Sequence, residues 1–127
     1  MEHGDCFFNK EVRGVPSHPW IIISDPTVDA NDVLIVNLTD AKNYHDQSCY
    51  LGPSDHPSVI TKPSCVAYQW AKLTSVAILE QAKAAGFLLM KAPISAATMR
   101  KILDGAQETD ELKNAHRAVL RSQGLIT

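Results

Sequence analysis

The sequence predicts an α+β protein with an antiparallel sheet, and two observations lead to that class. Six of the seven prolines precede residue 64, with short strand-like runs between them. Proline lacks a donor N–H and suits turns and sheet edges, so this part should form strands and loops. Beyond residue 73, apolar residues recur at helical spacing. Strands followed by helices are typical of α+β domains with antiparallel sheets.

The expected strands are short and rich in β-branched and aromatic residues. The clearest covers residues 33–39, and Asp25-Pro26 separates it from the run at residues 20–24. Further strands are expected at residues 5–8, 59–61, 65–70 and 87–91.

Three helices are expected in the rest of the chain, at residues 75–85, 96–105 and 110–123. Gly86 and Gly124 follow the first and the last, and glycine favours the left-handed conformation that ends many helices. Ser95 can cap the second helix, whose Met99 and Ile102 share one apolar face. One domain over residues 1–127 is expected, mainly β over 4–92 and helical over 93–127.

Charge and cysteine content narrow the functional classes. Twelve Lys and Arg against 14 Asp and Glu give a net charge of −2, which argues against a general polyanion binder. An enzyme with a local basic groove is still allowed. No apolar run approaches the roughly 18 residues of a membrane span, and no secretion signal is visible. Cys6, Cys49 and Cys65 are therefore interpreted as reduced thiols of a cytoplasmic protein.

A polar stretch carries the first candidate site. If residues 62–68 are extended, Lys62, Ser64 and Tyr68 point to one face, and His56 enters just before them. An amine, a hydroxyl and a phenol on one surface suit a phosphate, and histidine transfers protons near neutral pH. The alternative is a solvated strand face with a histidine in a turn.

The loop before residues 20–24 carries the second candidate site. Arg13 and His18 lie in it, among a glycine and two prolines. Arginine binds phosphate through two parallel hydrogen bonds, and histidine can act as acid or base. The alternative is an ordinary exposed loop.

Neither a metal nor an organic cofactor is expected. His45, Cys49, His56 and Cys65 have suitable atoms for zinc, but three, six and eight residues intervene, and no close ligand pair occurs. Glycine-rich phosphate loops, nucleophile elbows and dinucleotide fingerprints are absent from the sequence. A Cys–His nucleophile pair stays open as an alternative, although Cys65 alternates with Ser64 and should face the core.

Five segments stand out in chain order: Gly4-Asp5 before an aromatic strand, His18-Pro19-Trp20-Ile21-Ile22-Ile23-Ser24, Val33-Leu34-Ile35-Val36-Asn37-Leu38-Thr39, Lys62-Pro63-Ser64-Cys65-Val66, and Pro93-Ile94-Ser95 before a helix. In this order they resemble the PemK/MazF-like toxin family of toxin–antitoxin systems. The resemblance spans roughly residues 4–106 and rests on pattern and order rather than on one motif.

The resemblance implies a small SH3-like antiparallel β-barrel with C-terminal helices packed against it, and it also allows a strand at residues 75–85. Active members of that family are metal-independent endoribonucleases that cut single-stranded RNA, with the RNA 2′-hydroxyl as nucleophile. They form dimers and are neutralised by an antitoxin. The positions that match the family pattern are Arg13, Thr39 and Ser64.

One segment departs from the family pattern. The family commonly has an arginine and then an acidic residue after the strand at 65–70, whereas this chain has Ala71 and Thr74 there. Lys72 supplies a charge but lacks the fork geometry of arginine.

Two functions follow from these residues. The first is a toxin-like endoribonuclease, with His18 and His56 as the acid–base pair, Arg13 and Lys62 as cations, and Ser64, Tyr68 and Thr39 as substrate-binding residues. Its expected partners are single-stranded RNA, an antitoxin protein and a second copy, with no membrane. The alternative is a noncatalytic binding module or an inactive relative, with Trp20, Trp70 and Phe87 as apolar anchors.

Overall fold

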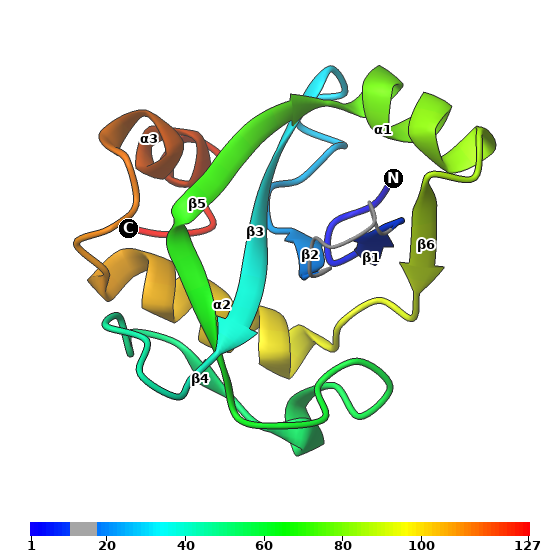
Figure 1. The fold of residues 1–127 in the computed structure, drawn as a ribbon. Helices are drawn as coiled ribbons and strands as arrows, with labels where there is room; N and C mark the ends of the chain where they lie inside the picture. Colours follow the sequence, from blue (N-terminus) through cyan, green and yellow to red (C-terminus); the bar gives the residue numbers. More distant parts are fainter. Residues whose placement is uncertain (11–17) are drawn as a thin grey trace.

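The computed structural model describes residues 1–10 and 18–127, and over these residues it contains one curled antiparallel sheet and three α-helices (Figure 1). The elements are β1 (Cys6–Asn9), β2 (Pro19–Ile22), β3 (Asp32–Asp40), β4 (Tyr50–Leu51), the 3₁₀ turn η1 (Pro53–Asp55), β5 (Ser64–Ser75), α1 (Val76–Ala84), β6 (Leu88–Lys91), α2 (Ala96–Glu108) and α3 (Asn114–Ser122). The strand order is β4-β5-β3-β2-β1-β6. The sheet curls into a half-barrel, which confirms the expected α+β class.

The long strands β3 and β5 form the centre of the sheet and account for its curvature. Their register shifts between Ile35 and Asn37, where Val36 on β3 faces several residues of β5. A bulge of this kind bends the strand and increases the local twist. Figure 1 shows β5 bending at this level, which lets the sheet wrap around α2.

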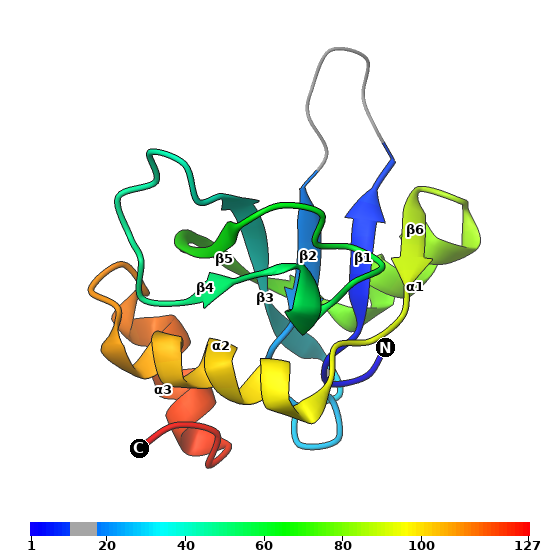
Figure 2. The ribbon, with the colours of Figure 1, turned by 90° about the horizontal axis from the view of Figure 1, so that it is seen from below.

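The helices cover the two faces of the sheet unequally. One face of the sheet, which we call the α2 face, packs on α2 and α3. Its buried core includes Leu34, Val66, Tyr68, Ile102 and Leu120. Figure 2 shows α2 and α3 together on one side of the molecule and α1 beside β6. The opposite face, the α1 face, has a smaller core that α1 covers through Leu79.

The contact between α2 and the sheet is closest at Gly105. A Cβ atom there would lie 2.7 Å from the Cβ of Cys49, 3.0 Å from the Ser48 carbonyl oxygen, and against the Tyr68 hydroxyl. That hydroxyl donates a hydrogen bond of 2.6 Å to the carbonyl of Ile102. Glycine at this position therefore lets the helix backbone approach the sheet.

Most expected elements are present, and the differences have local causes. All three helices occur, although the last begins at Asn114 rather than at residue 110. Ser75 caps α1 directly at the end of β5 by accepting a hydrogen bond from Ile78 N–H. The expected strand at residues 59–61 is wrong. The carbonyl of His56 accepts the N–H groups of Val59 and Ile60, which closes a turn there instead.

Strand β4 was not expected from the sequence. It consists of two residues, which pair with Cys65 and Ser64 on β5. Within the described residues, no helix is long and apolar enough to cross a membrane.

Candidate functional site

Part of the α1 face is open and polar. The core of that face includes Ile22 on β2 and Ile35 on β3. Side chains two residues apart in a strand share a face, so His18 and Trp20 continue the row of Ile22. By the same rule Asn37 and Thr39 continue the row of Ile35. Lys72 lies opposite Ile35 on β5, and its Nζ is 4.7 Å from the centroid of the Trp20 ring. We call His18, Trp20, Asn37, Thr39 and Lys72 the His18 surface.

His18 is held in a defined position on this surface. Its side chain is exposed, and its Nδ1 lies 3.0 Å from the carbonyl oxygen of Leu38 on β3. A carbonyl only accepts hydrogen bonds, so Nδ1 carries the proton and Nε2 of the neutral ring keeps a free lone pair. The β2–β3 register, continued by two pairs beyond Trp20 and Asn37, places His18 opposite Thr39. The imidazole is thus oriented as a base beside a hydroxyl.

A lysine pairs with the last residue of β3. The Nζ of Lys62 is 3.1 Å from the Oδ2 of Asp40, and both side chains are largely exposed. Hydrogen bonds from the Lys42 N–H and from Lys62 hold the pKa of Asp40 below its ordinary value. Asp40 follows Thr39 directly in β3, but adjacent side chains of a strand point to opposite faces. The Lys62–Asp40 pair therefore lies at the same strand end as Thr39 but not on the same face.

Three residues of the His18 surface were not among the sequence-based candidates for catalysis or substrate binding. Trp20 and Asn37 are cross-strand partners, and the cation–π contact adds Lys72 from β5. The Oδ1 atom of Asn37 is buried and lacks a hydrogen-bond partner among the described residues. The sequence could have indicated Asn37 as a candidate, because it is a polar residue within an otherwise apolar strand. Its neighbours, however, follow only from the pairing of β3 with β2.

Ser64 and Tyr68 do not form the expected exposed surface with Lys62, because this part of β5 is buried on both faces. Tyr68 is 1% exposed and lies in the core against α2. Burial raises the pKa of its phenol strongly. Ser64 is also buried, and its hydroxyl donates to the Lys62 carbonyl. Lys62 alone reaches solvent, so the period-two rule identified the shared face but not its direction. The roles of these residues in RNA binding stay predictions.

His56 is separated from the His18 surface by burial. It is 7% exposed, at the end of η1, and its Nε2 has no partner among the described residues. The neighbouring Asp55 is bound to α2, because its carbonyl accepts from the Thr98 hydroxyl and its carboxylate pairs with Lys101 at 2.6 Å. His56 and His18 therefore do not share one exposed site. Arg13 lies outside the described residues.

The cysteines have the properties of structural thiols. Cys6, Cys49 and Cys65 are all buried and free. Burial raises the pKa of Cys49 to about 12 and also raises that of Cys65, whose Sγ donates to the Gln47 side chain. Because a thiolate is the reactive form, this disfavours the Cys–His alternative. No group of three His, Cys, Asp or Glu side chains suited to a metal ion occurs within residues 1–10 and 18–127.

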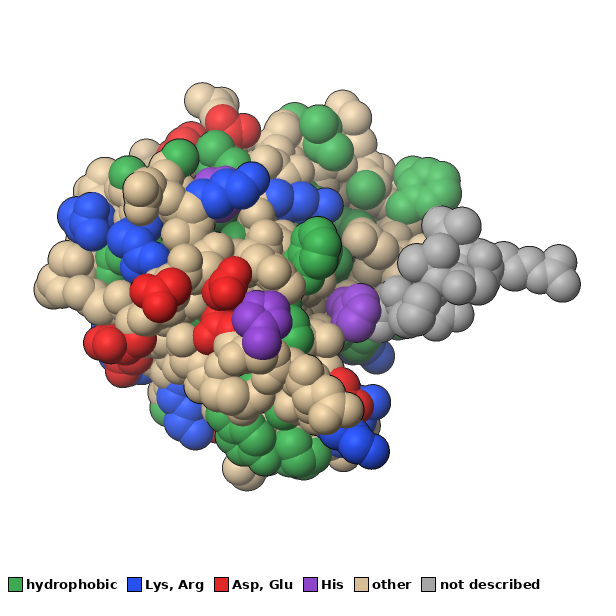
Figure 3. Space-filling view, turned by 60° about the vertical axis from the view of Figure 1, so that its left-hand side comes forward, with side chains coloured by type: hydrophobic (Ala, Val, Ile, Leu, Met, Phe, Trp, Pro, Cys, Tyr) green, Lys and Arg blue, Asp and Glu red, His purple; other side chains and the backbone are tan. Residues whose placement is uncertain are grey.

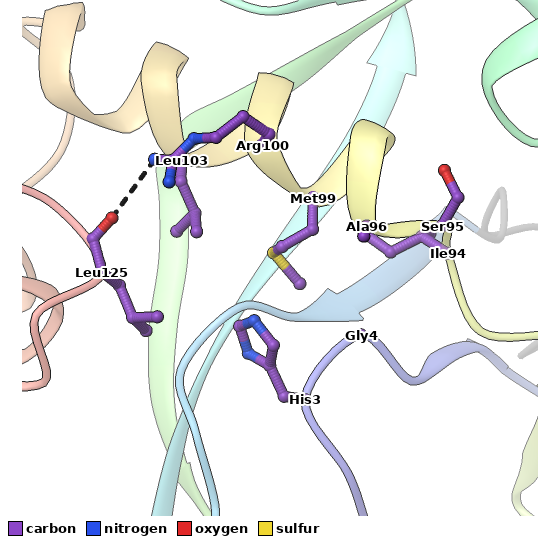
Figure 4. Close-up of a pocket in the computed structure, with 9 residues that line it drawn as sticks. All are labelled: His3, Gly4, Ile94, Ser95, Ala96, Met99, Arg100, Leu103 and Leu125. Atoms are coloured by element: carbon purple, nitrogen blue, oxygen red, sulfur yellow. Dashed lines mark hydrogen bonds between the residues drawn. The ribbon is translucent and has the colours of Figure 1, made fainter.

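A separate pocket of about 420 Å³ lies between the N-terminal segment and α2 (Figure 4). His3, Met99, Arg100 and Leu125 are among its lining residues, and Arg100 donates to the Leu125 carbonyl. The pocket contains none of the expected site residues. Figure 3 shows basic, acidic and histidine side chains interspersed on one face, without a large area of a single charge.

Comparison with known proteins relates this geometry to a fold. No family model matches the chain, and no curated protein matches it. Among solved structures, an endoribonuclease in complex with its cognate antitoxin from Mycobacterial species aligns with a TM-score of 0.54 and 20% identity. The alignment covers 89% of this chain and 95% of that one. The chain shares its fold with that endoribonuclease. At this identity, the likeness concerns the fold, and the function of the His18 surface is argued from its own residues.

Proposed function

We propose that this chain is a toxin-like endoribonuclease of the PemK/MazF type that acts in the cytoplasm on single-stranded RNA. In this proposal the RNA 2′-hydroxyl attacks the adjacent phosphorus without a metal ion, and the 5′-oxygen leaves. The products are a 2′,3′-cyclic phosphate and a 5′-hydroxyl. The observation that carries the proposal is the oriented, exposed imidazole of His18 beside Thr39, in a chain with the fold of an endoribonuclease.

His18 supplies the acid–base chemistry. Its Nε2 accepts the proton of the 2′-hydroxyl while Nδ1–H stays bonded to the Leu38 carbonyl. The resulting imidazolium can then give a proton to the leaving 5′-oxygen. The carbonyl stabilises the charged ring as well as orienting it, so one histidine serves both steps.

Positive charge and a hydroxyl complete the site. Lys62, Lys72 and the loop residue Arg13 compensate the charge that develops on the phosphoryl oxygens. The Thr39 hydroxyl donates a hydrogen bond to one of these oxygens. Because His56 is buried beside η1, the mechanism assigns it no contact with RNA. In this proposal, the protein partners are a second copy of the chain, with which it forms a homodimer, and an antitoxin.

The test is cleavage of a mixed-sequence single-stranded RNA by the purified protein in the presence of a chelator. General acid–base catalysis contributes roughly 10²–10⁴-fold, so His18→Ala and His18→Gln should each lose at least about 10²-fold in rate. The glutamine variant retains a donor for the Leu38 carbonyl but cannot exchange protons near neutral pH. The matched control is His45→Gln, because His45 is also exposed but pairs with Glu111.

Two results would contradict the proposal. If the His18 variants cleave as fast as wild type while remaining folded by circular dichroism, the assigned role is wrong. If RNA with a 2′-deoxy residue at the cleaved position is still cut there, the 2′-hydroxyl is not the nucleophile. Thr39→Val should slow cleavage by a smaller factor than His18→Ala, because it removes a single hydrogen bond.

A noncatalytic binding module is the second candidate function. The observation that favours it is the exposure of Trp70 and Phe87, together with the absence of the family's arginine at Ala71. Absence of cleavage of every RNA tested, combined with tight binding of a protein partner, would decide for this candidate.

A further inference from the structure

Strand β6 forms one edge of the sheet, and no strand within residues 1–10 and 18–127 pairs with its outer side. It is the last strand in the sheet order, and β1 pairs with it on one side only. Lys10 N–H donates a hydrogen bond of 2.8 Å to the Phe87 carbonyl, so these two residues form a hydrogen-bonded pair. Along an antiparallel ladder, hydrogen-bonded pairs alternate with pairs whose backbone groups point outward. Leu88 and Met90 therefore direct their backbone N–H and C=O groups away from β1. An added strand can pair with these four groups.

Apolar side chains flank this edge. Phe87, directly before β6, is 63% exposed, and Leu89 on β6 is 57% exposed, so two large apolar side chains meet solvent side by side with the strand edge. Phe8 of β1 lies opposite Leu89 and contributes to an open groove of about 770 Å³ with Leu88 and Leu89. The groove lies along the strand, so a chain that pairs with β6 would cover it.

The charges at the groove indicate the occupant. Lys10 and Lys91 are its charged lining residues, and no carboxylate occurs among the described residues that line it. The Nζ of Lys91 is 5.9 Å from the centroid of the Phe8 ring, so cationic and apolar groups are adjacent. A second copy paired on β6 would bring the same two lysines to the groove. The charge therefore favours an acidic partner over self-association.

We propose that the β6 edge binds an acidic, extended segment of another protein by strand addition. The segment pairs with the backbone of Leu88 and Met90, places apolar side chains on Phe8 and Leu89, and directs carboxylates to Lys10 and Lys91 nearby. Because Phe8, Leu89, Lys10 and Lys91 lie on one face of the β1–β6 pair, every second residue of the segment meets them. Backbone pairing supplies affinity, and an apolar residue flanked by acidic residues at these every-second positions supplies specificity. This inference is independent of the ribonuclease proposal, because the β6 edge contains no residue of the His18 surface.

The test is fluorescence anisotropy with a labelled ten-residue acidic peptide in which glutamate, leucine and glutamate occupy successive every-second positions, with serine or threonine between them. Three matched peptides act as controls: one with lysine for glutamate, one with the same composition in scrambled order, and one N-methylated at alternate backbone nitrogens. Binding of the acidic peptide alone is the expected result, with roughly fivefold or greater weakening by Lys10→Glu/Lys91→Glu together. Leu89→Ser, at an exposed position, should weaken binding by a similar factor.

Other outcomes overturn the inference. Equal binding of the N-methylated peptide would exclude strand addition, and equal binding of the lysine peptide would exclude the charge argument. Absence of binding by the acidic peptide would also reject the proposal. If sedimentation shows a dimer that Leu89→Ser dissociates, the edge belongs to a second copy instead. Because the assay measures binding without RNA, its result does not depend on cleavage.

Discussion

Replacing Gly105 with alanine sets helix propensity against packing in one substitution. Propensity favours the change, because alanine is a better helix former than glycine by about 1 kcal/mol. Packing opposes it, because the new Cβ would lie against the Tyr68 hydroxyl and 2.7 Å from the Cβ of Cys49. The variant therefore shows which effect dominates where α2 meets the sheet.

The structure gives the size of the opposing effect. Overpacking a core costs about 1–3 kcal/mol, and displacing the Tyr68 hydroxyl from the Ile102 carbonyl adds about 1–3 kcal/mol for a buried polar group without its partner. After the gain in propensity, Gly105→Ala should lower the free energy of unfolding by about 1–5 kcal/mol. For a chain of this length, a loss of about 2 kcal/mol lowers Tm by about 7 °C.

Urea and thermal unfolding followed by circular dichroism measure this difference. The control is Glu108→Ala, an exposed position of the same helix that should change stability by less than about 0.5 kcal/mol. Tyr68→Phe removes the atom nearest the new Cβ, so Gly105→Ala should cost less in that background than in wild type. A Gly105→Ala variant about 1 kcal/mol more stable than wild type, as propensity alone requires, would refute the reasoning.

The remaining predictions concern polar groups that join the helices to loops. The guanidinium of Arg117 donates to the carbonyls of Ala106 at 2.6 Å and Thr109 at 2.7 Å, so Arg117→Lys should lower the free energy of unfolding by about 1–2 kcal/mol. An unchanged urea midpoint would contradict this. The carboxylate of Asp46 accepts from the N–H and hydroxyl of Ser48 and from the hydroxyl of Thr109. Asp46→Asn should therefore cost about 1–3 kcal/mol at pH 7. Burial raises the pKa of Asp46, but these hydrogen bonds outweigh burial and hold the pKa below its ordinary value. The stabilisation is then fully present above about pH 4 and is lost as the pH falls through the folded-state pKa. The stability difference between wild type and Asp46→Asn should accordingly shrink below about pH 4, and a difference that stays constant in acid would contradict the assignment.

Local patterns in the sequence predicted the elements whose own residues stabilise them. The strand expected at residues 33–39 and the helix after Ser95 both occur, because β-branched runs and a capped amphipathic stripe favour one local conformation. The β-branched run at residues 59–61 failed because hydrogen bonds to the His56 carbonyl stabilise a turn. The two residues of β4 form a strand only because β5 lies beside them as a template.

The sequence by itself determined the fold class, the period of each strand and the candidate status of His18 and Thr39. Only the tertiary structure decided which candidates reach solvent. Alternation assigns two residues to the same face, but it cannot tell whether that face meets water or a helix. Tyr68 is buried because α2, far away in sequence, packs on it. His56 is buried next to Asp55, which α2 holds in place, whereas His18 is exposed on a face of the sheet that α1 covers only in part. The contact between the His18 ring and the Leu38 carbonyl spans 20 residues. It exists through strand pairing, a long-range interaction that no local pattern encodes.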